Sequence, residues 1–142
     1  MRLEIAGATL LRSPEWTAAP GSDLERLGEA RVRDLMERFL DAVFADSMIG
    51  FFFVGRQLAR IRELELRFAI EHLGGGSAYN GRPLNVAHAP PQVPPILGAH
   101  FDRRREILRE TLEAAQVDVD IRERWLAHNE AQRPLIVRGA CR

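Results

Sequence analysis

Apolar residues recur at helical spacing between positions 32 and 44, and charged residues fill the positions between them. They fall at i, i+3, i+4, i+7, i+8, i+11 and i+12 and form one wide stripe: Val32, Leu35, Met36, Phe39, Leu40, Val43 and Phe44. A stripe with this period is typical of a helix that buries one face. The segment therefore predicts a long amphipathic helix.

Three further segments repeat this pattern. A helix is predicted from about Arg56 to Leu73, where three glycines end it, and another from roughly Ala99 to Ala115. A last helix starts near Ile121, and Pro134 is expected to kink or end it. Neither the alternation of a strand nor an internal repeat is present in the sequence. The fold class is predicted to be all-α.

Two proline-rich stretches interrupt the helices. Residues 1–21 show no steady period and are predicted to be an N-terminal extension, with residues 22–142 as the domain. Ser22 or Asp23 is a plausible helix cap at the start of that domain. The stretch 89–95, with four prolines, cannot be one continuous helix.

Composition and charge exclude several classes of protein. The 142 residues suffice for one domain with a real core, and 20 basic residues balance 20 acidic ones. No net field therefore favours nucleic acid or an anionic membrane. The sequence has neither a membrane-spanning apolar run nor the apolar core of a secretion signal. Its single cysteine, Cys141, cannot form an internal disulfide, so we expect a cytoplasmic protein.

One histidine follows a helix and a turn-rich loop in a way that suggests metal chemistry. The chain breaks at Gly74, passes through Tyr79-Asn80-Gly81-Arg82, and reaches His88 between small apolar residues. A neutral imidazole placed there would face a cavity beside the preceding helix, as the axial ligand of an iron porphyrin does. An ordinary loop histidine is the alternative that these residues alone leave open.

A set of short motifs, in order, resembles the truncated haemoglobin family over about residues 23–137. These are 24–30, 38–46, Phe52-Phe53, Leu73-Gly74-Gly75, Tyr79-Asn80-Gly81-Arg82, Ala87-His88, His100-Phe101-Asp102-Arg103 and Arg133-Pro134-Leu135. The resemblance implies a shortened globin fold, a two-over-two helical sandwich around haem b. It also implies that His88 is the iron ligand and that Phe53 packs on the haem.

The resemblance further implies a set of cofactor-binding residues: Leu40, Phe53, Arg60, Ile61, Leu64, Glu65, Phe68, Tyr79, His88 and Phe101. Two of them have open alternatives. Tyr79 either reaches a haem propionate or caps its loop. Arg60 either pairs with a propionate, which suits a guanidinium fork, or stays solvated on its helix.

The chain departs from the family pattern at two positions that, in the family, face the gas ligand. Leu40 stands where a tyrosine is common, and Glu65 where a glutamine is common. An unpaired Glu65 in an apolar pocket would be protonated and could donate to the ligand. The alternative, which we favour because burying an unpaired ionisable group is costly, puts it at the rim.

The resulting pocket is predicted to be unusually apolar: Leu40, Phe53, Ile61, Leu64 and Phe68. It would give bound dioxygen little hydrogen-bond help. Fast oxygen release, or a preference for carbon monoxide or nitric oxide, follows as a hypothesis.

The other histidines are not expected to bind iron. His72 lies eleven residues beyond Ile61, the position that resembles the one over the iron, which is ~16 Å along a helix. His100 and His128 sit in charged helices and are expected at the surface or at a helix terminus.

The expected function is reversible binding of a diatomic gas (O2, NO or CO) at a five-coordinate iron. Turnover such as nitric oxide dioxygenation would need a separate reductase, because the chain has no flavin or nicotinamide domain. A haem-based sensor or haem-handling module is one alternative. A haem-free globin-fold interaction protein is another.

Overall fold

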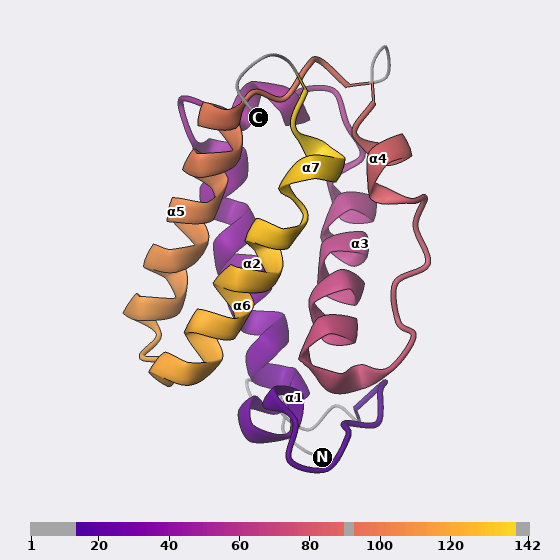
Figure 1. Ribbon diagram of the computed structural model, residues 1–142, viewed down its shortest axis with the longest axis vertical. Helices are drawn as coiled ribbons and strands as arrows, with labels where there is room; N and C mark the ends of the chain where they lie inside the picture. Colours follow the sequence, from indigo (N-terminus) through magenta and orange to yellow (C-terminus); the bar gives the residue numbers. More distant parts are fainter. Residues whose placement is uncertain (1–13, 90–92, 139–142) are drawn as a thin grey trace, which may run out of the picture.

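A computed structural model describes residues 14–89 and 93–138, and every regular element in them is helical (Figure 1). The predictions for residues 1–13, for Pro90 and Pro91 and for Cys141 lie outside these residues. None of the helices in the described ranges is long and apolar enough to cross a membrane.

The helices follow one another in a simple order. They are α1 (Asp23–Leu27), α2 (Glu29–Ala45), the 3-10 turn η1 (Gly50–Phe53), α3 (Leu58–Ile70), the π-type turn η2 (Glu71–Gly75), α4 (Leu84–Ala87), α5 (Gly98–Ala114), α6 (Val119–Ala131) and α7 (Arg133–Ile136). The predicted long helices are confirmed to within a few residues.

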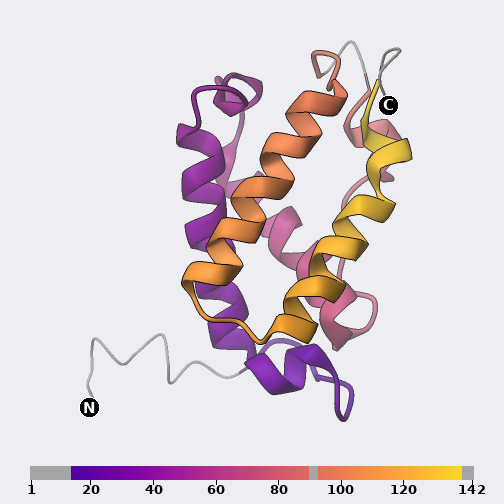
Figure 2. The same ribbon diagram turned by 60° about the vertical axis from the view of Figure 1, so that its left-hand side comes forward.

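The four long helices form two layers of two. Helices α2 and α3 pack together, and α5 and α6 form an antiparallel pair whose α5 contacts α2. In Figure 2, α5 and α6 run side by side in front of α2 and α3. This is the two-over-two arrangement that the resemblance implies.

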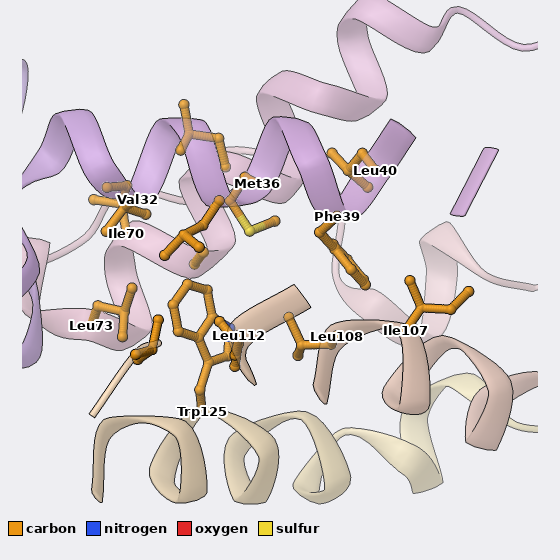
Figure 3. Close-up of a cluster of buried hydrophobic side chains, with 14 of the residues drawn as sticks. Val32, Met36, Phe39, Leu40, Ile70, Leu73, Ile107, Leu108, Leu112 and Trp125 are labelled. Carbon is orange, nitrogen blue, oxygen red and sulfur yellow. The ribbon is translucent and has the colours of Figure 1, made fainter. Parts of the chain in front are cut away.

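One hydrophobic core joins the two layers (Figure 3). Helix α2 contributes residues of its predicted stripe, and α5 contributes Leu112. The side chains of Val32, Phe39 and Leu112 are each 1 % exposed or less. Trp125 of α6 points into the same cluster and is 2 % exposed. Burying one such side chain contributes roughly 1.5–3 kcal/mol, so this shared cluster holds the layers together.

The ends of the helices have clear local causes. Ser22 caps α1, since its hydroxyl accepts a hydrogen bond from the Glu25 amide at 3.1 Å. Pro134 lies in the first turn of α7, where a missing N–H costs nothing, so the predicted break falls between α6 and α7. Both were predicted from the sequence.

Residues 14–21, the described part of the predicted extension, pack on the domain. The Glu29 carboxylate accepts the backbone amides of Glu15 and Trp16 at 2.9 and 3.0 Å. The Ala19 amide donates to the Gly74 carbonyl at 2.9 Å. Gly74 has φ 121°, and a Cβ there would lie 2.4 Å from the Ser22 Cβ, so this crossing requires glycine.

Candidate functional site

A cavity of about 580 Å³ opens between α3, α4, α5 and the ends of α6 and α7. Its size is that of a site for a sizeable organic ligand. Its wall contains nearly all the residues that the sequence analysis assigned to a cofactor: Phe53, Arg60, Ile61, Leu64, Glu65, Phe68, Tyr79, His88 and Phe101. Residues from far-separated parts of the chain are thus brought to one place.

Leu40 is the exception. Its side chain is 2 % exposed inside the hydrophobic core, and it is not part of the cavity wall among the described residues. The neighbouring Phe39 is also buried, and its ring lies beneath the guanidinium of Arg104, which does line the cavity. On this side Arg104 of α5 is the residue that contributes to the cavity wall.

His88 follows the short helix α4 and faces the cavity. Its Nδ1 lies 2.8 Å from the Leu84 carbonyl oxygen. A carbonyl only accepts, so Nδ1 carries the proton and Nε2 keeps its lone pair. Burial lowers the pKa of the imidazole below its ordinary value, against the opposing effect of the Leu84 hydrogen bond. His88 is therefore a neutral imidazole with a fixed tautomer.

The position of α4 is fixed from the other end of the chain. The Arg138 guanidinium donates to the Asn85 carbonyl at 2.8 Å, and the Arg138 amide donates to the Ile96 carbonyl at 2.7 Å. These bonds tie the end of α7 to α4 and to the segment before α5. They hold the histidine against the cavity although α4 itself has no buried residue.

Aromatic rings form much of the apolar wall. Phe52 and Phe53 of η1 both line the cavity, and Phe53 packs at a tilt against Phe44 with ring centroids 4.9 Å apart. Phe68 of α3 and Phe101 of α5 line other parts of it. Such a wall suits a large apolar ligand.

The structure favours one of the two alternatives for Tyr79. Its hydroxyl donates to the Arg82 carbonyl at 2.6 Å, and its ring meets Phe68 edge-on. The Tyr79 side chain therefore closes its own loop. The guanidinium groups of Arg60 and Arg82 are exposed and border the cavity, where a carboxylate on a bound ligand would find them.

A charged cluster on the inner wall was not predicted. Arg104 donates to a Glu65 carboxylate oxygen at 2.7 Å and to the Asn129 side-chain oxygen at 2.6 Å. The sequence alone gives Glu65 no evident partner, and in the structure Arg104 supplies one from a position 39 residues away. The one available signal was that Arg104 lies between Phe101 and Leu108 on the buried face of α5.

The structure also corrects the expectation of an unusually apolar pocket. Ile61, Leu64 and the phenylalanines are present in the wall, but the pair Glu65–Arg104 lies beside them. The charges are arranged as a pair because an isolated one would be costly to bury.

Of the remaining histidines, His100 lines this cavity, whereas His72 and His128 stack on each other outside its wall. His72 faces a second, small cavity between the layers, where its ring stacks on His128 at a centroid distance of 4.0 Å. His128 is thus half-buried in the last turn of α6 and is not a plain surface residue. His100 Nδ1 accepts the Leu97 amide at 3.0 Å at the start of α5, as expected for a helix terminus.

The chemistry of this site fits a largely apolar macrocycle that carries a metal ion and has carboxylate groups at one edge. A neutral imidazole offers one metal ligand, phenylalanine and aliphatic side chains offer a dry wall, and arginines stand at the border. No observation on the described residues conflicts with such a group.

Comparison with known proteins gives an independent result. A family model described as bacterial-like globin matches residues 24–133. A group 1 truncated hemoglobin, GlbN, of Mycolicibacterium paratuberculosis is 31% identical over 101 residues, which are 70% of this chain and 72% of that protein.

Solved structures agree with the fold. THB1 of Chlamydomonas reinhardtii has 29% sequence identity and a TM-score of 0.71, covering 83% of this chain and 98% of that one. The 2/2 hemoglobin from Synechococcus sp. PCC 7002, solved in the cyanomet state with covalently attached heme, has 27% identity and a TM-score of 0.70. That comparison covers 78% of this chain and 91% of the other.

Proposed function

This chain belongs to the bacterial-like globins, a haem-binding family with the truncated two-over-two fold, and we propose that it binds a diatomic gas through haem b held by His88. In this assignment residues 22–142 are the haem-binding domain and residues 1–21 an extension. The lone cysteine of the sequence supports a reducing, cytoplasmic setting.

The state of His88 carries the proposal. A histidine ligand to iron must be neutral, and its second nitrogen is usually held by a hydrogen bond that sets the ring's orientation. His88 meets both conditions, because burial disfavours its protonated form and its Nδ1 is bonded to Leu84. The neutral state and the ring orientation that a metal ligand needs are thus set by the protein itself.

The other wall residues have supporting roles. Phe53, Ile61 and Phe68 would exclude water from the faces of the macrocycle. Arg60 and Arg82 would pair with the propionates where the cavity meets solvent, each pair being worth little because both arginines are exposed. Tyr79 keeps its loop closed and is not assigned a propionate contact.

Haem iron with a single protein ligand has one open position, and that is the chemistry the group would supply. The chain's part is to hold the iron by His88, since His72 faces a different cavity and His100, which also lines this cavity, accepts the Leu97 amide at its Nδ1. Redox turnover of nitric oxide would require electrons from a reductase.

The test is to add haem to the purified protein and pass it through a desalting column. We expect one haem per chain to be retained, and the reduced form to change its absorption spectrum on adding carbon monoxide. Failure to retain haem would favour the haem-free interaction protein instead.

A matched pair of variants tests where the haem sits. Ala87 lines the cavity, while the neighbouring Val86 is 43 % exposed and does not contribute to its wall in the described chain. We expect Ala87→Trp to block haem retention by filling the cavity and Val86→Trp to leave it intact. Equal retention by both variants would contradict the proposed site.

A further inference from the structure

Arg104 is fixed by contacts from three other helices. It donates to Glu65 of α3 at 2.7 Å and to Asn129 of α6 at 2.6 Å. Its guanidinium carbon lies 4.9 Å from the centre of the Phe39 ring of α2, within cation–π distance. The side chain is therefore held in place before any ligand enters the cavity.

The cluster and His88 stand on different walls of the cavity. Phe39 is 1 % exposed, so the cluster rests against the hydrophobic core and forms the inner wall. Helix α4, which presents His88, has no buried residue and lies at the edge of the molecule (Figure 1). Glu65, Arg104 and His88 all line this one cavity.

The guanidinium of Arg104, which lines the cavity, retains hydrogen-bonding capacity. Arginine has five N–H groups, and the bonds to Glu65 and Asn129 use two of them. The side chains of Glu65 and Arg104 are 23% and 25% exposed, so their charges are less screened than those of surface pairs.

We propose that Arg104 selects small inorganic anions, such as fluoride, azide or nitrite, that would bind in this cavity to an iron held by His88, and that Glu65 competes with them for its guanidinium. This inference rests on the proposed function, because the ligand position requires iron at His88. An anion gains a charge-assisted hydrogen bond from Arg104, whereas a neutral ligand such as carbon monoxide gains little. The Glu65 carboxylate opposes the anion by repulsion and by occupying the donor.

The experiment titrates azide and fluoride into the ferric haem protein and follows the absorption spectrum at one fixed pH. Glu65→Gln keeps the shape of the side chain and removes its charge, so we expect anion affinity to rise about 10-fold. Arg104→Met is expected to lower it by roughly 10- to 100-fold. Arg109→Met is the control, because Arg109 pairs with Glu106 and Glu113 on its own helix.

Two measurements separate the anion contact from simpler effects. Arg104→Met also leaves Glu65 unpaired, so the double variant, Glu65→Gln with Arg104→Met, is compared with Glu65→Gln alone. The double variant should bind azide at least 10-fold more weakly than Glu65→Gln. Carbon monoxide affinity of the ferrous forms should stay within about 3-fold throughout. A double-mutant cycle on urea unfolding of the haem-free protein should show that the two residues are coupled.

The outcomes distinguish this inference from the proposed function. Loss of haem from the parent protein would overturn both. If the double variant keeps its full haem content and binds azide as tightly as Glu65→Gln does, the proposed role of Arg104 is overturned and the proposed function is not. If Arg104→Met does not fold, Glu65→Gln still decides, since an unchanged or lower anion affinity there contradicts the competition.

Discussion

The stacked histidines between the two layers predict a loss of stability on mild acidification. The ring centroids of His72 and His128 are 4.0 Å apart, and the rings are nearly parallel, with an interplanar angle of 11°. His72 Nε2 is buried and has no hydrogen-bond partner in the described part of the chain. Burial, followed by the charge of His128, lowers the pKa of His72 from 6.5 to about 4.

The sign and size follow from proton linkage. Between pH 6.5 and about 4, His72 is protonated in the unfolded chain but not in the folded chain. The contribution of His72 to stability is therefore fully present above pH 6.5 and decreases as the pH is lowered toward 4. A pKa difference of about 2.5 corresponds to ~3.4 kcal/mol for a fully buried group. The ring is only partly buried, so we expect a loss of about 1–2 kcal/mol.

The assay is urea unfolding of the haem-free protein at pH 7.5, 6.5, 5.5 and 4.5, followed by circular dichroism. His72→Gln removes the titrating group, and its stability should fall about 1–2 kcal/mol less than that of the parent between pH 7.5 and 4.5. His128 and His88 have pKa values lowered by burial and titrate in both proteins, so only the difference between the two counts. Parallel curves for parent and variant would refute the assigned state of His72.

Two further predictions concern the loops around the site. Gly74→Ala should lower the free energy of unfolding by about 2–3 kcal/mol, because its φ is 121° and its Cβ would collide with Ser22, whereas Gly76→Ala, with open space around it, should cost about 1 kcal/mol. Thermal unfolding checks both, and equal losses would contradict the packing of this crossing. Tyr79→Phe should cost about 0.5–1.5 kcal/mol by removing the bond to Arg82 while leaving haem affinity unchanged. A large drop in haem affinity there would instead indicate a propionate contact.

Features that depend on one segment could be predicted from the sequence. The stripe of α2, the Ser22 cap and the break near Pro134 each depend on neighbours within a turn or two. The position of His88 beside a cavity came from the order of short motifs, since its own neighbours alone favour an ordinary loop histidine.

Features that depend on the meeting of two segments could not be predicted. Glu65 and Arg104 are 39 residues apart, and helical periodicity says which face is buried but not which residue lies opposite. The same holds for His72 and His128, which belong to different layers. For Leu40, periodicity correctly indicated burial, but it does not distinguish a side chain in the core from one in the cavity wall.

The central claim, that His88 holds the haem iron, is tested most directly by the absorption spectrum of the reduced His88→Gly protein with and without added imidazole. The account predicts that the variant loses the parent spectrum and most of its haem, and that free imidazole restores the spectrum by entering the vacated space. His72→Gln, whose ring faces the other cavity, should match the parent throughout. An unchanged spectrum in His88→Gly without imidazole would contradict the account.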